Sequence, residues 1–481
     1  MSVDSAPVVP TARGVFCNRT LNMRSIQAVG FDMDYTLVHY DEHAWEARAY
    51  AHVRQRLVDQ GLPVADLRFD PSLFTRGLIV DTELGNIVKA SRFGYVTQAA
   101  HGTRMLDLEC RRRTYSQVWV DLGEPRWVFL NTLFSLSEAC LFGQLVDLRD
   151  EGRLPGSLDY EAIYALARDA IDAAHLEGQL KAEIIAEPEH FVVLDADLAD
   201  ALLDLKQAGK RLFLATNSEW HYTRAMMSYA FDRFLSGPGW RDLFELVIVQ
   251  ARKPRFFDGS AEFTEIDEES EQRDFGRTVD RLEAGRVYRG GNAQDLQTYL
   301  GLGGAEILYV GDHVYADVHV SSRIRRWRTA LVLRELEAEV EQEQAFRRAQ
   351  RELQAGMEQK GALEAEQALL RLALQRLQNG RTLPAGVSGD EATLRERLRH
   401  LRGTVDSLDL ALAPLAQRAS QLGNERWGPL MRSGNDKSRL ARQIERHADI
   451  YTSRVSNLLY LTPFGYLRAA RGSLPHDACG P

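Results

Sequence analysis

Short apolar runs that end in polar residues recur along the first two thirds of the chain. Runs this short and continuous are typical of strands buried on both faces of a parallel sheet. Four of them end near side chains capable of chemistry: 28–31 before Asp32, 212–215 before Thr216, 246–249 ahead of Lys253, and 307–310 before Asp312. A fifth run, 329–333, is expected to complete the sheet. The pattern predicts a Rossmann-like α/β core whose four polar tips meet at the carboxyl edge of one sheet.

A long insertion separates the first two strand tips. Residues 41–185 exceed the length of a loop, so we expect a cap domain inserted into a core formed by 15–40 and 186–334. The insertion contains an apolar, strand-like stretch at 127–134 and a helical stretch from 160 to about 181. Later in the core, the acidic segment 258–280 has weak periodicity, which predicts an exposed excursion between two strands.

After Leu333 the composition of the chain changes, and long stretches are rich in Glu, Gln, Arg and Leu. Apolar residues recur there at alternating steps of four and three, the pattern of a helical seam: Leu394, Leu398, Leu401, Val405, Leu408 and Leu412. The Gly- and Pro-containing stretch 379–390 would join two helices, so 335–425 is predicted to form an antiparallel hairpin with a structural role. We expect 1–14 to be a disordered tail, and 426–481 to be a helical segment that packs on the core or at an oligomer interface.

Composition and charge narrow the class of protein. The chain is 44% hydrophobic and 26% charged, as in an ordinary soluble protein, and its formal charge of -9 argues against binding nucleic acid. The four cysteines lie far apart without a Cys-x-x-Cys spacing, which argues against a zinc site or a disulfide framework. No apolar run reaches the roughly 18 residues of a membrane span, and the first residues lack a signal or transit pattern. We therefore expect a cytoplasmic protein.

The polar strand tips together suggest phosphoryl chemistry with a hard cation. A lone Asp-x-Asp such as Asp32 and Asp34 is more often a turn or a helix cap. A second acidic pair, Asp312 and Asp317, follows another strand, and oxygen-rich acidic clusters suit Mg²⁺. A threonine hydroxyl and a lysine at further tips can hold a phosphoryl group and offset its charge. The joint pattern is far more specific than any of its parts.

These positions resemble the four motifs of the haloacid dehalogenase-like hydrolase superfamily. Longer runs resemble the cytosolic purine 5'-nucleotidase family, which acts on IMP and GMP: FDMDYTL, LFTRGLIVDTELGN, FLNTLFSL, LATNSE, ARKPRFF and ILYVGDHVYADV. The similarity begins near Val15 and resumes after the predicted hairpin, so it spans most of the chain. It implies a Mg²⁺-dependent hydrolase of purine nucleoside 5'-monophosphates, with phosphoryl transfer to a second nucleoside where that acceptor outcompetes water.

The resemblance also implies roles for the motif residues. Asp32 would be the nucleophile that forms an aspartyl-phosphate, and Asp34 would be the general acid and base. Mg²⁺ would bind Asp32, the backbone carbonyl of Asp34, and Asp312, while Asp317 would orient the metal shell. Phosphoryl oxygens would be held by Thr216, Asn217 and Lys253. All of these residues are present in the chain.

Substrate choice is assigned to the cap, because the core motifs contact only the phosphate. Positions matching the family's substrate contacts are Asn131, Phe134, Arg168, Asp172, His175 and Lys181. A purine would stack on Phe134. Three of the others are spaced by four and three residues on one helix face, a pattern that a solvated charged stripe also explains. Where the purine enzymes have Asn after this Phe, the chain has Ser135, which makes base preference less certain than the chemistry.

The family forms tetramers built from dimers and is activated by ATP at a second site. Matching positions for an effector are Asn131, Tyr315, Arg323, Gln443 and Arg446. The family's effector site contains an Arg that this chain lacks, with the region of Asp121 in its place. The family's acidic C-terminal tail is also absent from this chain. Two other interpretations stay open: a related phosphatase acting on another phosphomonoester, and a non-catalytic oligomeric scaffold.

Overall fold

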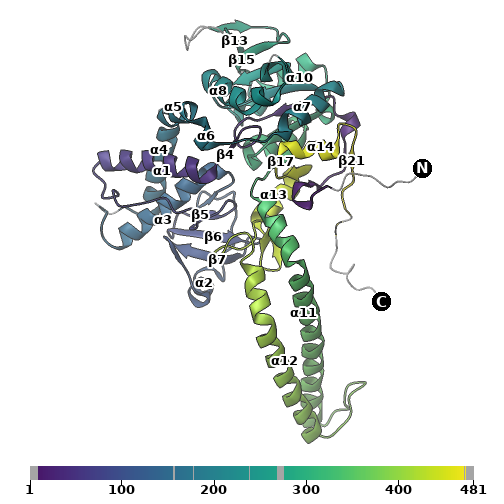
Figure 1. Cartoon of the computed structure of the whole chain (residues 1–481). Helices are drawn as coiled ribbons and strands as arrows, with labels where there is room; N and C mark the ends of the chain where they lie inside the picture. Colours follow the sequence, from purple (N-terminus) through teal and green to yellow (C-terminus); the bar gives the residue numbers. More distant parts are fainter. Residues whose placement is uncertain are drawn as a thin grey trace, which may run out of the picture. The chain divides into compact units, whose positions relative to one another are not determined.

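The computed structural model describes residues 9–154, 156, 158–176, 178–237, 239–267, 276–470 and 472 (Figure 1). The chain divides into two compact units, one formed by Met1–Glu337 with Leu430–Pro481 and the other by Ala338–Pro429. Among the described residues, no helix has both the length and the apolar character that crossing a membrane requires.

The first unit is built on a ten-stranded sheet. From one edge to the other its strands are β1 (Val15–Cys17), β20 (Ile450–Thr452), β17 (Arg328–Val332), β16 (Ile307–Gly311), β3 (Ala28–Phe31), β11 (Arg211–Ala215), β12 (Leu246–Val249), β15 (Arg286–Gly290), β13 (Phe263–Ile266) and β14 (Gly276–Val279). The strands from β20 to β15 are parallel, and the others pair antiparallel. The prediction of an α/β fold with a large parallel sheet is confirmed.

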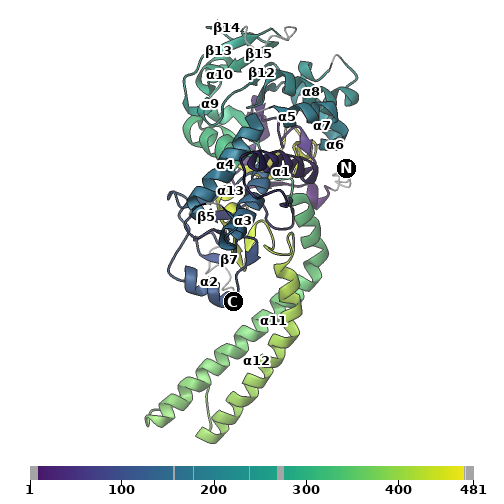
Figure 2. The same ribbon diagram turned by 90° about the vertical axis from the view of Figure 1, so that its left-hand side faces the viewer.

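Helices cover both faces of this sheet. On one face α7 (Asp197–Gln207) and α8 (Trp220–Phe231) pack on Val29 and Phe31, and on the other α9 (Arg255–Asp258) and α10 (Ala293–Leu300) pack around Phe213 and Tyr309 (Figure 2). A Cβ on Gly30 would lie 2.2 Å from the Phe213 ring, so β3 needs glycine there to accept that ring. Burial on both faces explains why these strands are continuous apolar runs in the sequence.

The sheet is wider than the five predicted strands. The acidic segment 258–280 contributes β13 and β14 instead of a plain excursion, although 268–275 lie outside the described residues. The C-terminal segment is only partly helical, with α13 (Arg439–His447) and α14 (Leu458–Leu461) beside β20 and the short strands β18 (Arg432–Ser433), β19 (Asp436–Lys437) and β21 (Tyr466–Leu467), of which β21 pairs with β2 (Leu21–Asn22). The sequence signal was weak because these strands are short or lie near an edge.

The tail expected at 1–14 is ordered in its last part. Residues 1–8 lie outside the described range, but a short helix, Thr11–Arg13, leads into β1. The Arg13 guanidinium donates hydrogen bonds to Ser456 at 2.9 Å and to Asp197 at 3.1 Å. These contacts join the start of the chain to its C-terminal segment and to α7.

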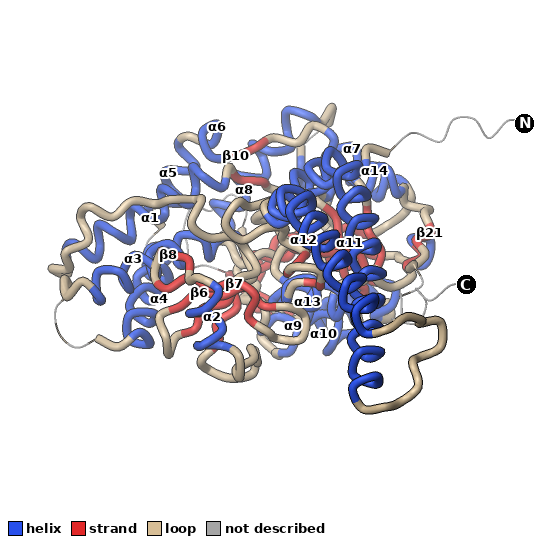
Figure 3. The backbone as a smooth tube through the Cα atoms, turned by 90° about the horizontal axis from the view of Figure 1, so that it is seen from below, coloured by secondary structure: helices blue, strands red, loops and turns tan. Residues whose placement is uncertain are grey.

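The inserted cap is a small sheet covered by helices. Its strands are ordered β8 (Arg104–Met105), β7 (Val96–His101), β6 (Asn86–Ala90), β5 (Ile79–Asp81) and β9 (Trp127–Phe129), all antiparallel. Helices α2 (Leu108–Tyr115) and α3 (Leu136–Asp150) pack on this sheet, and α1 (Glu42–Asp59) and α4 (Tyr160–Leu176) pack with α3 (Figure 3). The helix predicted over 160–181 is interrupted, because Gly178 has φ 73° before α5 (Gln179–Ala186) begins.

Two short strands join the cap to the core. The chain leaves the core through β4 (His39–Tyr40) just before α1, and it returns after α6 (Pro188–Phe191) through β10 (Val192–Val193). These strands pair antiparallel, with Tyr40 opposite Val192. The two chain segments that connect the core to the cap therefore form a single hydrogen-bonded strand pair, which we call the crossover ribbon.

The second unit is a helical hairpin. Its helices, α11 (Leu336–Gln378) and α12 (Glu391–Ser420), run side by side (Figures 1 and 2). Asp390 caps α12 by accepting a hydrogen bond from the Thr393 amide. Of the predicted seam, Leu394, Leu398, Leu401, Val405 and Leu412 are buried, and Leu408 is half-buried. The compact unit begins at 338 and ends at 429, whereas the sequence suggested 335–425.

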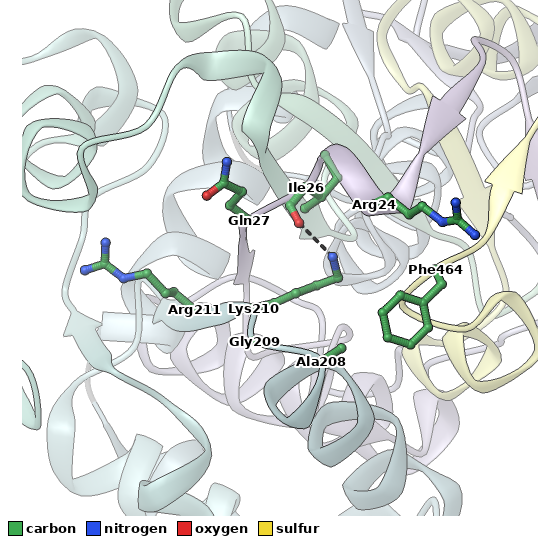
Figure 4. Close-up of a pocket in the computed structure, with 8 residues that line it drawn as sticks. All are labelled: Arg24, Ile26, Gln27, Ala208, Gly209, Lys210, Arg211 and Phe464. Atoms are coloured by element: carbon green, nitrogen blue, oxygen red, sulfur yellow. Dashed lines mark hydrogen bonds between the residues drawn. The ribbon is translucent and has the colours of Figure 1, made fainter.

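A pocket of about 290 Å³ lies at the amino ends of β3 and β11 (Figure 4). The Lys210 side chain extends beneath it and donates hydrogen bonds of 2.7 Å to the carbonyls of Met23 and Ile26. Burial lowers the pKa of Lys210. The pocket lies at the end of the sheet opposite the four polar tips, and its buried amine satisfies backbone carbonyls, which is a structural role.

Glu46 provides a stability test of the cap. Its carboxylate is buried and accepts a 2.8 Å hydrogen bond from the Ser137 amide, and burial raises its pKa to about 7. The folded state therefore binds more protons than the unfolded state between about pH 4.5 and 7, so stability falls as pH rises through that window. Glu46→Gln should raise the free energy of urea unfolding at pH 8 by up to about 3 kcal/mol.

At pH 4 the same variant should match the wild type, because Glu46 is then protonated in both states. Glu189→Gln, on the exposed α6, is the matched control and should change stability at neither pH. An equal effect of Glu46→Gln at both pH values would contradict the assignment.

Candidate active site

The chain turns sharply where β3 ends. The Asp32 amide still donates to the Val310 carbonyl as in a strand, but the Met33 carbonyl then accepts from the amides of Thr36, Leu37 and Val38. Tyr35 has φ 52°, the left-handed region that a non-glycine residue rarely adopts. This compact turn brings Asp32 and Asp34 to the same edge of the sheet.

Three buried carboxylates converge there. Oxygens of Asp32, Asp312 and Asp317 all lie within 4.8 Å of one another. Asp312 follows β16, the neighbour of β3, and Asp317 follows in the next helical turn. A Cβ on Gly311 would lie 2.5 Å from the Asp317 carboxylate, so glycine is needed for this close approach. The Asp317 carboxylate also accepts a 3.1 Å hydrogen bond from the His313 amide.

Lys253 neutralises part of this cluster. Its ammonium lies 2.7 Å from Asp32 and 2.8 Å from Asp317, and it donates a 3.2 Å hydrogen bond to the Tyr309 hydroxyl. Burial opposes the charge of Lys253, but Asp317 and Asp32 together raise its pKa well above the ordinary value. Lys253 is therefore a fixed cation between two of the three carboxylates.

The remaining charge suits a divalent cation. Three carboxylates against one ammonium leave a buried excess of two negative charges. Burial raises the pKa of Asp32 well above its usual range and that of Asp312 to about 7. A cation bound to these oxygens would reverse that effect, and the all-oxygen donor set is the one that Mg²⁺ prefers.

The tip of β11 supports Lys253. Thr216 is fully buried, its amide donates to the Ile248 carbonyl, and its hydroxyl accepts from the Ser218 amide at 3.1 Å. The Asn217 side chain is bonded in both directions to the Lys253 backbone, at 2.6 and 3.2 Å. The resemblance gave Asn217 a role in holding phosphoryl oxygens, and that role stays a prediction; its side-chain amide lies against the Lys253 main chain, where it fixes the approach of that lysine.

The Asp34 carboxylate accepts hydrogen bonds from two hydroxyl groups. Its Oδ1 accepts a 2.5 Å hydrogen bond from the Tyr40 hydroxyl, and its Oδ2 accepts a 2.7 Å hydrogen bond from the Ser218 hydroxyl. Tyr222 donates in turn to the Tyr40 hydroxyl at 2.9 Å. The expected contribution of Asp34 to a metal through its backbone carbonyl is compatible with this side-chain orientation.

The cap contacts the metal motif through Arg76. This arginine is only 2% exposed, and its guanidinium donates to the backbone carbonyl of Asp312 and, at 3.0 Å, to that of Asn131. It also lies 3.6 Å from the Glu335 carboxylate. Thr132, beside Asn131, donates a 3.5 Å hydrogen bond to the Asp312 carboxylate. The cap segment 131–132 is thus held against the tip of β16.

Phe134 occupies the same part of the cap. Its ring meets the rings of Tyr35 at 4.7 Å and Trp45 at 5.5 Å edge-on, so it adjoins the turn that carries Asp34. Ser135, where the purine enzymes have Asn, is buried. The structure thus places the residue predicted to stack on the base next to the turn that carries Asp32 and Asp34.

Three of the other predicted substrate contacts, Arg168, Asp172 and Lys181, are paired with protein. Arg168 lies 3.2 Å from Glu138 and 3.2 Å from Asp172, so these two predicted residues do share a helix face. His175 belongs to α4, but its side chain lies outside the described residues. Lys181 forms a 2.6 Å ion pair with Glu219 of the core, and its ammonium lies 5.2 Å from the centre of the Tyr222 ring.

Three of the predicted effector positions, Tyr315, Arg323 and Arg446, lie near two histidines. Tyr315 is exposed and stacks on His319, whose ring nitrogen lies 2.9 Å from that of His447. Burial and then His319, Arg446 and other arginines lower the pKa of His447 to about 3. Arg323 also contributes to the low pKa of both histidines, whereas no described contact of Gln443 joins this group. His313 caps the helical turn that follows it, because its ring nitrogen accepts hydrogen bonds from the amides of Tyr315 and Ala316.

Sequence reasoning missed four residues that shape the site: Tyr40, Arg76, Thr132 and Ser218. Three of them, Arg76, Thr132 and Ser218, lie within the runs quoted for the family resemblance. Tyr40 carries no such signal, because its only local feature is a short strand. Their roles depend on contacts between cap and core that spacing alone does not show.

The chain is similar to several known proteins. A 5'-nucleotidase domain-containing protein of Dictyostelium discoideum is 28% identical over 486 residues, which cover 98% of this chain and 76% of that protein. Among solved structures, a β-phosphoglucomutase from hyperthermophilic Pyrococcus sp. strain ST 04 has a TM-score of 0.30 and 10% identity, over 64% of this chain and 86% of that one. A HAD phosphatase from Thermococcus onnurineus has a TM-score of 0.24 and 15% identity, over 64% and 87%. The model of the 5' nucleotidase family matches residues 15–479, and the chain therefore belongs to the 5' nucleotidase family.

Proposed function

We propose that this member of the 5' nucleotidase family hydrolyses purine nucleoside 5'-monophosphates, IMP and GMP, with Mg²⁺ and through an aspartyl-phosphate. Hydrolysis of phosphomonoesters follows from the family itself. The observation that carries the finer proposal is the buried set at four adjacent strand tips, in which Lys253 bridges Asp32 and Asp317 within reach of Asp312. This set combines a nucleophile, a fixed cation and an oxygen-rich site in one place.

The first step assigns Asp32 as nucleophile. Its Oδ1 accepts hydrogen bonds from Lys253 at 2.7 Å and from the Met33 amide at 2.8 Å, which fixes the carboxylate. A carboxylate oxygen attacks phosphorus in line, the bond from phosphorus to the 5' oxygen breaks, and Asp34 donates a proton to the departing nucleoside. Lys253 offsets the charge on the phosphoryl oxygens.

The second step releases phosphate. Asp34, now a carboxylate, takes a proton from water as the water oxygen bonds to phosphorus and the bond to Asp32 breaks. The products are inorganic phosphate and free Asp32, so atoms and protons balance over the two steps. Asp32, Asp312 and the carbonyl of Asp34 would hold Mg²⁺, with Asp317 orienting the site, and the ion would offset the charge of carboxylates and phosphate.

Purine preference is assigned to Phe134. Phe134→Leu keeps most of the apolar volume that packs against Tyr35 and Trp45, but it removes the flat ring. We expect the KM for IMP and GMP to rise about tenfold with little change in kcat, because a stacked base contributes roughly 1–3 kcal/mol. The measurement is phosphate release with Mg²⁺ across IMP, GMP, AMP, CMP, UMP and glucose 6-phosphate.

Different results of this assay separate the remaining interpretations. Leu73→Ile, an apolar change elsewhere in the cap, is the control and should leave all KM values as in the wild type. An unchanged KM in Phe134→Leu would remove this residue from the base site. Fast turnover of glucose 6-phosphate alone would indicate another phosphomonoesterase, and no turnover of any substrate would favour a scaffold.

A further inference from the structure

Asp34 is held by a chain of hydroxyl groups. Tyr222 donates to Tyr40, Tyr40 donates to Asp34, and Ser218 donates to the other oxygen of the same carboxylate. Both tyrosines are buried. Each hydroxyl has one proton to donate, so along this chain the two tyrosines act as fixed hydrogen-bond donors.

Each carboxylate oxygen has two lone pairs. With one lone pair on each oxygen used by Tyr40 and Ser218, the plane of the carboxylate is set, and one lone pair on each oxygen remains for a proton. A carboxylate held in this way can present its proton only from one of these two remaining lone pairs, each of which has a fixed direction. Removing one donor frees the side chain to rotate without removing the acid itself.

The position of Tyr40 ties this arrangement to the cap. Tyr40 lies in the crossover ribbon, where it pairs with Val192 at the point where the chain returns to the core. The second tyrosine also contacts the cap, because the ammonium of Lys181 on α5 lies 5.2 Å from the centre of the Tyr222 ring. Lys181 is anchored by a 2.6 Å ion pair with Glu219 of the core. The two tyrosine hydroxyl groups in the chain of hydrogen bonds to Asp34 are therefore both positioned by contacts between core and cap.

We propose that Tyr40 is a positioning residue that aims the proton of Asp34 at the leaving nucleoside, and that Tyr222 holds Tyr40 in place. The inference rests on the proposed function, since it assigns Asp34 the role of general acid. It makes delivery of the proton dependent on the crossover ribbon, so that the acid is correctly aimed when the cap is seated on the core.

The leaving group gives a direct test. A nucleoside alkoxide is a poor leaving group and needs the proton, whereas p-nitrophenolate leaves readily without one. The ratio kcat/KM reports only steps up to departure of the leaving group, so it isolates the acid step from hydrolysis of the aspartyl-phosphate. Tyr40→Phe should lower kcat/KM for IMP about tenfold, but that for p-nitrophenyl phosphate less than about threefold.

Three further variants complete the experiment. Tyr222→Phe leaves the hydrogen bond from Tyr40 to Asp34 in place and should show the same selective loss, to a smaller extent, which provides a second reading if Tyr40→Phe folds poorly. Asp34→Asn should lower kcat/KM for IMP by about 10²–10⁴-fold with a much smaller effect on the aryl phosphate. Tyr115→Phe removes another buried hydroxyl, bonded to Asp81 and Asn86 in the cap, and should affect neither substrate.

The outcomes are distinguishable. An equal loss on both substrates in Tyr40→Phe, or no loss on either, overturns the positioning role. A wild-type protein that is inactive on both substrates, or an Asp34→Asn variant that turns over IMP at the wild-type rate, overturns the proposed function instead. A selective loss on IMP in both tyrosine variants supports the inference.

Discussion

Replacing Asp32 by Asn is expected to lower kcat for nucleotide hydrolysis by about four orders of magnitude or more. The amide oxygen cannot attack phosphorus to give an acyl phosphate, and no other described carboxylate takes its place: Asp317 is held by Lys253, and Asp312 lies beside Thr132. The measurement is phosphate release from IMP with Mg²⁺. Mass spectrometry of acid-quenched protein should show a phosphate adduct on wild-type Asp32 and none on the variant.

The same substitution should leave the fold intact. Asn has nearly the same volume, and burial together with the neighbouring carboxylates already disfavours the charge of Asp32, as its raised pKa shows. We therefore expect a melting temperature without Mg²⁺ equal to or above that of the wild type. Asp107→Asn is the matched control, because Asn caps α2 as well as Asp does and the position lies far from the chemistry in the sequence. Turnover retained in Asp32→Asn would refute covalent catalysis.

The central strands could be predicted because burial on two faces leaves one physical signal. Val29 and Phe31 face one layer of helices while Ala28 and Gly30 face the other, so no polar residue interrupts the run. The outer strands gave no such signal. β14 is mostly exposed and β20 has three residues, and pairing of β20 with β17 depends on chain segments more than a hundred residues apart.

The candidate site could be predicted most directly where a strand ends at a site residue. Asp32, Thr216 and Asp312 directly follow strands, and neighbouring parallel strands bring their ends together whatever the rest of the chain does. Arg76 and Tyr40 reach the site from the cap and from the crossover ribbon, and their partners Asp312 and Asp34 are fixed by how the cap packs. Asn217 shows a different limit, since the motif identified the residue but not that its amide supports Lys253.

Lys253→Met is expected to affect both activity and stability. The methionine side chain fills a similar space, but the variant leaves Asp32 and Asp317 buried without their shared cation. Removing one partner of a buried ion pair typically costs about 3–5 kcal/mol, and loss of an electrostatic group at a reacting centre lowers kcat about 10²–10³-fold. Phosphate release and urea unfolding measure the two effects. Lys360→Met, which removes an exposed ion pair with Asp409 in the hairpin, should change neither.

The stability loss in Lys253→Met should depend on pH in a defined direction. Burial raises the pKa of Asp32 and Lys253 lowers it, so removing the lysine raises this pKa further. The folded variant then binds a proton that the unfolded chain has already released, and its stability falls as pH rises above the unfolded value of about 3.8. The deficit against the wild type should therefore be larger at pH 8 than at pH 5.

Lys253→Met with Asp317→Asn should recover part of the stability at pH 8 but none of the activity, because the second change removes a buried charge without restoring the cation. A deficit that is independent of pH and unchanged in the double variant would mean that Lys253 stabilises the fold through packing rather than through its charge.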